Sequence, residues 1–251
     1  MSPLLRLALA STLCAWLGAA ESPAPKPVTV AEAPAASPLR YESRMLRGWS
    51  VLIRVELLSD EKRAETEKGL SLIAKQLEDI ERLVPPKALA KLRKVTLWLS
   101  PPYANARPRA EYHPGAEWLK ANGRNPAMAK GVEFTDVSHL DKEVLRMPLL
   151  TLHELAHAYH DQVLGNDHPG IKACYDQAVA GKSYDKVSRK NWEGKITEGV
   201  RAYAMTNPME YFAETTEAFF GRNDFFPYDR KELEAHDPAM VEVLKKAWGA
   251  P

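Results

Sequence analysis

His153, Glu154 and His157 have the residue types and the spacing that bind a catalytic metal ion, because they form an HExxH pattern within the segment 151–159. On a helix, residues four positions apart share a face. Both imidazoles can therefore reach one zinc ion while Glu154 points at a metal-bound water. The alternative is a pair of core histidines that hydrogen-bond to Glu154. The pattern predicts a zinc site or a buried polar cluster on one helix.

A catalytic zinc site needs a third protein ligand and an open fourth position. Glu210, Glu214 and Glu217 line one stripe of the segment 206–220, whose other residues are largely apolar. Carboxylates on such a helix repel one another unless cations neutralise them. We therefore expect Glu210 to be the third ligand and Glu214 to orient a ligand imidazole. His160 lies one turn too far from the metal, and we expect it beside the ligands or on the surface.

Glu210 also has an explanation that needs no metal. Asn207, Pro208 and Glu210 follow the pattern of a capping box, in which the cap residue and the residue three positions later satisfy the first backbone N–H groups of a helix. The metal interpretation becomes the stronger one only in combination with the HExxH pattern upstream.

The run from Tyr203 to Glu214, YAMTNPMEYFAE, resembles the downstream motif of a family of gluzincin metallopeptidases. These enzymes are related to the catalytic domain of anthrax lethal factor and to the bacterial Pro-Pro endopeptidases. In that family a tyrosine stands seven residues before the glutamate ligand, which is followed by two aromatic residues, alanine and glutamate. The resemblance covers residues 140–225. It departs from the family at His160-Asp161, where members tend to carry acidic residues.

The resemblance implies that one zinc ion is bound by His153, His157 and Glu210. It also implies that Glu154 is the general base, that Tyr203 assists at the oxyanion and that Glu214 supports the ligands. Without the resemblance, Tyr203 would be a core aromatic in a short strand over 200–204.

Three regions differ in composition. Residues 1–20 carry a single charge, Arg6, before an uncharged Leu- and Ala-rich run, as a cleavable signal peptide does. We therefore expect a secreted or periplasmic protein. The apolar run is too short to span a membrane, so no stable membrane anchor is expected. Residues 21–40 are rich in Pro and Ala and predict a disordered linker, and residues 41–251 predict a single domain.

Charge and cysteine content exclude other classes. The chain has 251 residues, with 34 Lys plus Arg and 33 Asp plus Glu, and a formal net charge of +1. No electrostatic attraction to nucleic acid is expected from this balance. One of the two cysteines, Cys14, lies in the predicted signal peptide. Cys174 is therefore expected to be a buried thiol without a disulfide partner.

Hydrophobic periodicity predicts an α+β domain, in which a small mixed sheet packs on a mainly helical C-terminal part with the HExxH helix. The resemblance implies the zincin-like metallopeptidase fold. Strands are expected over 49–57, 95–99 and 131–137, and helices over 60–84, 88–92, 148–163, 170–180, 208–220, 229–235 and 238–248. Residues 101–130 are expected to be an irregular loop. Tyr112 and His113 are expected on its surface, with the border of a substrate cleft as the alternative position.

These features predict a secreted zinc metallopeptidase, an endopeptidase that hydrolyses a peptide or protein substrate through a zinc-activated water. The strand over 131–137 is expected to offer its edge to the extended substrate. Two alternatives stay open. One is a zinc-retaining but inactive module that binds peptides or cell-wall fragments. The other is a structural secreted protein without metal, in which the HExxH pattern is a coincidence. The substrate and the oligomeric state are not predicted.

Overall fold

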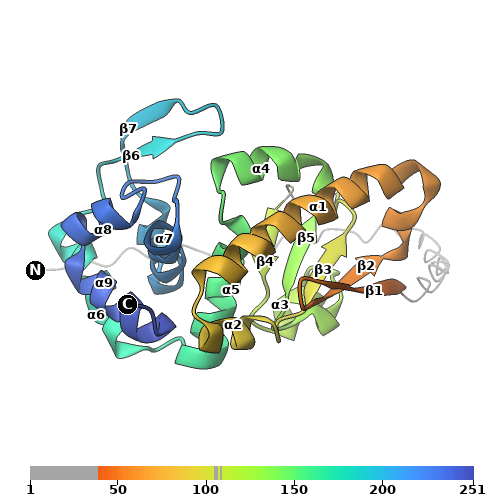
Figure 1. Ribbon diagram of the computed structural model, residues 1–251, viewed down its shortest axis with the longest axis horizontal. Helices are drawn as coiled ribbons and strands as arrows, with labels where there is room; N and C mark the ends of the chain where they lie inside the picture. The colour runs from red at the N-terminus through yellow and green to blue at the C-terminus, as the bar shows by residue number, and fades with distance from the viewer. Residues whose placement is uncertain (1–38, 105–106, 108) are drawn as a thin grey trace, which may run out of the picture. The chain divides into compact units, whose positions relative to one another are not determined.

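A five-stranded mixed sheet and the helices around it make up the part of the chain that the computed structural model describes, residues 39–104, 107 and 109–251 (Figure 1). The predicted α+β class is confirmed. These residues belong to one compact unit. The predicted signal peptide, and all but the last two residues of the predicted linker, lie outside the described residues. Within them, no helix is long and apolar enough to cross a bilayer.

The sheet has the strand order β1-β2-β3-β5-β4. Its inner strands are parallel, and its two edge strands are antiparallel to their neighbours. The inner strands are β2 (Trp49–Arg54), β3 (Leu97–Ser100) and β5 (Val132–Thr135), and the edge strands are β1 (Tyr41–Leu46) and β4 (Arg109–Tyr112). One side of the β4 backbone is therefore left unpaired by any strand of this sheet.

The strand order corrects two expectations. β5 pairs with β3 on one side and with β4 on the other, so the strand expected over 131–137 has no free edge. The stretch 101–130 is not an irregular loop, because it contains β4, helix α3 (Ala116–Ala121) and the 3₁₀ turn Pro126–Met128. The edge available to an extended ligand therefore belongs to β4.

β1 is a second element that the periodicity does not predict. It joins β2 through Arg47 and Gly48, which both have positive φ angles, 53° and 84°. A two-residue hairpin turn of type I′ requires positive φ at both positions. The burial of β1 alternates only weakly because the strand lies at the edge of the sheet.

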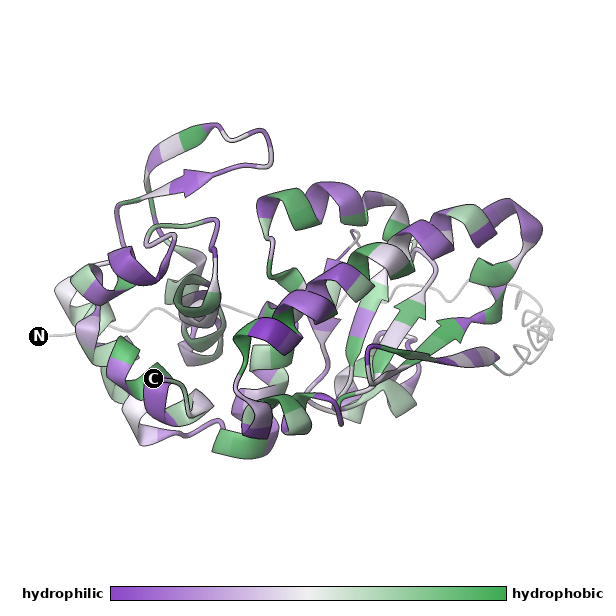
Figure 2. Cartoon of the chain, in the orientation of Figure 1, coloured by the Kyte–Doolittle hydropathy of each residue, from purple (hydrophilic) through white to green (hydrophobic). Residues whose placement is uncertain are grey.

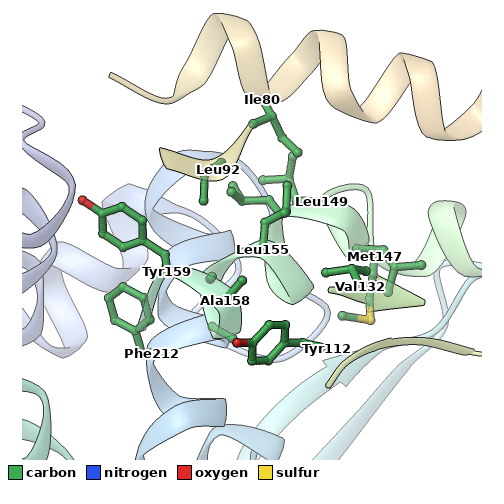
Figure 3. Packing of buried hydrophobic residues seen from close by; sticks show 14 of the residues in the cluster. Ile80, Leu92, Tyr112, Val132, Met147, Leu149, Leu155, Ala158, Tyr159 and Phe212 are labelled. Carbon is green, nitrogen blue, oxygen red and sulfur yellow. The ribbon is translucent and has the colours of Figure 1, made fainter. Parts of the chain in front are cut away.

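Helix α5 (Leu150–Tyr159) lies at the centre of the described structure and contacts α1 (Asp60–Leu83), α7 (Pro208–Phe220) and β4. All but one of its residues are buried. Figure 3 shows Ile80 of α1 above Leu149 and Leu155, and Phe212 of α7 beside Tyr159. Packing against α1, α7 and β4 fixes the rotation of α5 about its axis, and therefore the direction in which its polar residues point.

The helix predicted over 148–163 is divided in two. α5 ends at Tyr159, and the chain continues as a π-helical turn, His160–Leu164, before Gly165 stops it with a φ of 84°. π-helical turns occur frequently at functional sites.

The remaining helices lie within one or two residues of the predicted ranges. They are α2 (Pro86–Leu92), α6 (Pro169–Gly181), α8 (Arg230–His236) and α9 (Pro238–Trp248), and α7 and α9 match their predicted ranges at both ends. A further short helix, α4 (Leu140–Arg146), precedes α5.

Trp248 at the end of α9 joins the two central helices. Its ring stacks on Tyr159 of α5 at a centroid distance of 4.3 Å and on Phe212 of α7 at 5.7 Å. Its Nε1–H donates to Thr216 Oγ1 at 3.2 Å. Because the tryptophan is almost fully buried, these contacts hold α5 and α7 together within the core.

A two-stranded hairpin, β6 (Val187–Lys190) and β7 (Ile196–Val200), is also not predicted. Figure 2 shows its strands mostly in the hydrophilic colour, whereas the central strands of the five-stranded sheet are mostly hydrophobic. Hydrophobic alternation cannot identify a hairpin that buries so little apolar surface. Backbone hydrogen bonds from Lys190 to Asp224 and from Phe226 to Ser188 attach the hairpin to the segment that follows α7.

Candidate metal centre

The side chains of His153, His157 and Glu210 meet at one point between α5 and α7. Glu210 Oε2 lies 3.2 Å from His153 Nε2 and 3.3 Å from His157 Nε2, and the two Nε2 atoms are 3.2 Å apart. Each residue thus offers one ligand atom to a common position. The three residues predicted from the sequence as metal ligands are brought together.

Local structure explains this convergence. His153 and His157 are one turn apart on α5, so their rings lie on the same face, 4.8 Å apart at an interplanar angle of 84°. Glu210 is in the first turn of α7, which starts at Pro208 with Asn207 as its cap. The start of α7 faces α5, and the carboxylate can therefore reach both imidazoles.

The capping alternative for Glu210 is half right. Asn207 Oδ1 accepts the backbone N–H of Glu210 at 2.9 Å, as a cap residue does. The Glu210 carboxylate, however, contacts His153 and His157 instead of closing the box at Asn207. Capping explains the residue at position 207 but not the direction of the carboxylate at position 210.

The donor atoms of this cluster fit a cation. His153 Nδ1 is 2.7 Å from Glu217 Oε1, a distance at which the ring donates its Nδ1 proton and keeps a lone pair on Nε2. That lone pair then faces a carboxylate oxygen and a second imidazole nitrogen. Three lone pairs at this separation repel one another unless a positive charge lies between them. Two imidazoles and a carboxylate are the ligand set of a catalytic metal site.

The pKa values of the cluster show the same demand for positive charge. Burial alone would raise the pKa of Glu210, but the adjacent rings of His153 and His157, whenever they are protonated, outweigh it and hold the pKa well below its usual range. Burial would lower the pKa of His153, but Glu210 and Glu217 raise it well above its usual value. A positive charge beside Glu210, whether on a protonated imidazole or on a metal ion, therefore stabilises the ionised carboxylate.

Glu217, and not Glu214, makes the contact with a ligand imidazole that was expected for Glu214. It is Glu217 that hydrogen-bonds to the ligand imidazole of His153, whereas Glu214 Oε2 accepts from Asn223 Nδ2 at 3.0 Å. Both carboxylates are buried. Burial, and then the neighbouring Glu217, raise the pKa of Glu214 to about 8, and burial also raises the pKa of Glu217. The sequence signal for Glu217 is its spacing of seven residues from Glu210, which places both on one face of α7.

Glu154 lies beside the ligand atoms without being one of them. Its Oε2 accepts the backbone N–H of Tyr112 at 2.8 Å, which ties the carboxylate to the edge strand β4. Burial raises the pKa of Glu154, and the two histidines oppose that shift. A fixed carboxylate with a raised pKa, next to a set of candidate metal ligands, is suited to general-base chemistry.

Tyr203 borders the site from the other side. It begins a 3₁₀ turn, Tyr203–Thr206, after β7 has ended at Val200, so it is not the core aromatic of a strand over 200–204. The residue is 48% exposed, and its hydroxyl donates to Glu210 Oε1 at 3.3 Å. A phenol with this exposure can donate to a ligand in the cleft.

His160 is fully buried, so of its two expected positions, beside the ligands or on the surface, the surface position is excluded. Its ring packs on Phe212 at a centroid distance of 5.1 Å. Among the described residues, neither ring nitrogen has a hydrogen-bond partner. Burial lowers its pKa to about 4, so the ring is neutral near pH 7. It is a packing residue behind the ligands.

The site opens into a cleft of about 660 Å³. His153, Glu154, His157, Glu210 and Tyr203 all line it, and β4 forms one of its walls. The expected position of Tyr112 and His113 on a loop surface is wrong, although Tyr112 does line the cleft. Tyr112 is a buried residue of β4, and the buried His113 ring bonds to Glu133 at 2.9 Å. A ligand in the cleft can reach the metal centre, the Glu154 carboxylate and the edge of β4.

Comparisons with protein-family models, with curated proteins and with solved structures found no match to this chain.

Proposed function

We propose that this protein is a zinc-dependent peptidase with a zincin-like fold of the gluzincin type, secreted or periplasmic, that hydrolyses peptide bonds in the cleft. The observation that supports this most strongly is the convergence of His153 Nε2, His157 Nε2 and Glu210 Oε2 on one point beside the Glu154 carboxylate. The two histidines and Glu210 would hold one zinc ion. When bound, zinc supplies a Lewis acid that makes water more acidic and polarises a carbonyl group.

Glu154 is the proton carrier in this proposal. One of its oxygens is held by the Tyr112 N–H, and the other is available to take a proton from the attacking water. The new bond joins the water oxygen to the carbonyl carbon, and the bond to the amide nitrogen breaks. Glu154 then delivers the proton to the leaving amine, so the carboxylate is restored.

Tyr203 stabilises the charge that develops on the carbonyl oxygen. Its hydroxyl donates to Glu210 Oε1, a bond that is long at 3.3 Å. A hydrogen bond to a developing oxyanion would be stronger than this one because it is charge-assisted. The partial exposure of the residue permits the hydroxyl to move from Glu210 to the substrate.

The peptide substrate pairs with β4 and not with β5. The N–H of Tyr112 points away from β5 toward Glu154, so by the alternation of an antiparallel ladder the N–H and C=O of Ala110 also point outward. Ala110 lines the cleft. An extended peptide can accept and donate one backbone hydrogen bond there, which is strand addition to a sheet edge.

Ala110→Pro removes the outward N–H without removing a ladder bond to β5. Proline is tolerated on an edge strand when its missing N–H faces away from the sheet. We expect roughly a 3- to 10-fold lower kcat/KM, the worth of about one hydrogen bond, and little change in Tm. Ala110→Val, which keeps the N–H, is the matched control. Equal losses in both variants would contradict backbone pairing at this position.

The carboxylate behind His153 tunes the metal ligand. Loss of such a partner typically costs 10- to 100-fold in metal affinity, so we expect Glu217→Gln to weaken zinc binding by about tenfold in a chelator competition titration. The control is Glu214→Gln, which removes a neighbouring buried carboxylate that does not bond to the imidazole. An equal effect of both substitutions would argue for a general charge effect.

The function is tested by metal analysis and by cleavage of a mixed peptide library. We expect one zinc per purified chain, cleavage of some peptides, loss of cleavage with chelator and recovery with zinc. A protein that holds zinc and cleaves nothing would be the inactive binding module. A protein that takes up no zinc would contradict the metal centre itself.

A further inference from the structure

Four arginines line the cleft, and the three that belong to helices or strands lie at one end of it. Arg109 is at the start of β4, Arg146 is at the end of α4 and Arg189 is in β6. We refer to these residues as the arginine cluster. Leu150, at the start of α5, lines the same cleft one turn before His153. The arginine cluster and the candidate metal ligands therefore line the same cleft.

Arg146 is a structural member of the cluster. Its two terminal nitrogens donate to Asp224 at 2.9 Å and to Glu143 at 2.6 Å. Asp224 Oδ2 also accepts from Arg189 Nε at 3.0 Å. The carboxylates of Glu143 and Asp224 are thus already paired with arginine. Asp224 also bridges α4 to the hairpin.

Arg189 is held in place but not saturated. Its guanidinium stacks over Phe225 at 4.7 Å, and its backbone forms a β-bridge with the same residue. Only Nε has an acceptor among the described residues, and 42% of the side chain is exposed. The two terminal nitrogens remain available as a planar fork that matches a carboxylate. Because the side chain is already ordered, binding costs little conformational entropy.

The Arg109 guanidinium also has N–H groups without a close acceptor among the described residues. Its contact with Glu111 is long, 3.4 Å, whereas Glu111 has a shorter bond of 2.9 Å to Arg124. The Arg109 side chain is 47% exposed. Arg109 and Arg189 therefore each keep guanidinium N–H groups that no short hydrogen bond to a described residue uses.

On the premise of the proposed function, we propose that the arginine cluster selects peptides with a carboxylate two or three residues from the cleaved bond. Tyr112, whose N–H holds Glu154, and Arg109 are three residues apart along β4, about 10 Å. A peptide extended along β4 therefore brings its second or third residue beyond the cleaved bond to the cluster. The carboxylate is an Asp or Glu side chain or the end of the chain.

Cleavage profiles of the wild type, Arg189→Gln and Arg109→Gln test this selection. Arg146 continues to neutralise Asp224 in Arg189→Gln, so the fold should be kept, and a thermal melt checks it. We expect the wild type to favour Asp and Glu at that position, and each variant to lose roughly tenfold in kcat/KM on such peptides. Arg82→Gln, on α1 and 70% exposed, is the matched control outside the cleft. No acidic preference in the wild type would overturn the proposal.

A binding measurement separates this proposal from the proposed function. The full chain with Glu154→Gln is titrated with a C-terminally amidated Glu peptide, its Gln analogue and the same Gln peptide with a free C-terminus. Tighter binding of the Glu peptide identifies a side-chain carboxylate, and tighter binding of the free-ended peptide identifies the chain end. Either preference should weaken with salt and with Arg189→Gln. Equal binding of all three would overturn the selection even if the protein is a peptidase. A charge preference without any cleavage by the wild type would overturn only the peptidase.

Discussion

Glu154→Gln should lower kcat by about 10²- to 10⁴-fold while the protein keeps its zinc, because the substitution removes the proton carrier but none of the three ligands. The neutral side chain is nearly isosteric and can still accept the Tyr112 N–H through its amide oxygen. Activity should therefore fall without a loss of stability or of metal. Steady-state kinetics on a library-derived peptide, together with metal analysis of the same sample, measure both quantities.

The matched control for this substitution is Glu143→Gln, which replaces another glutamate that lines the cleft but lies at the arginine cluster. Its effect on kcat should be small compared with that of Glu154→Gln. Full activity of Glu154→Gln with zinc bound would show that another group carries the proton, and the mechanism would be wrong.

Glu210→Ala should abolish stable zinc binding and peptidase activity. The loss in affinity should exceed the roughly 10- to 100-fold cost of removing a partner that only supports a ligand. A ligand that binds only the folded state at 100 times its Kd stabilises that state by about 2.7 kcal/mol. Zinc added at 100 times its Kd should therefore raise the free energy of unfolding of the wild type by about this amount, which is observed as a higher Tm. Glu210→Ala should show no increase in Tm.

Asn207→Ala separates the metal role of Glu210 from its role at the helix start. It removes the side chain that accepts the Glu210 N–H, at a typical cost of about 1 kcal/mol, but leaves the carboxylate in place. Zinc binding should survive in Asn207→Ala and be lost in Glu210→Ala, whereas the stability measured in chelator should fall mainly in Asn207→Ala. The reverse pattern would mean that Glu210 serves the helix and not a metal.

Local signals account for what the sequence predicts well. α7 begins and ends as expected because Asn207 and Pro208 fix its start, and α9 does so because Asp237 and Pro238 fix its start and Gly249 follows its end. The HExxH spacing predicts the shared face of His153 and His157 directly, because four residues make about one helical turn. That this face meets Glu210 is not a local signal, because it depends on how α7 packs against α5.

Contacts between distant segments account for what the sequence does not predict. Arg109–Tyr112 alternates charged with apolar or aromatic residues over only four positions, which is too short a run to identify a strand whose pairing partner comes later in the chain. The choice between Glu214 and Glu217 as partner of His153 depends on the rotation of α7 against α5, and both residues share the apolar side of their helix. The arginine cluster combines β4, α4 and β6, which no local pattern brings together.

The position of Trp248 has a consequence for biosynthesis. The last carboxylate at the metal centre, Glu217, leaves the ribosome well before the tryptophan whose ring joins Tyr159 to Phe212. Until α9 has been translated and has docked, the helices that carry the two histidines and Glu210 lack the Trp248 ring that packs against both of them. The candidate metal ligands should consequently be held less firmly in nascent chains than in the complete protein.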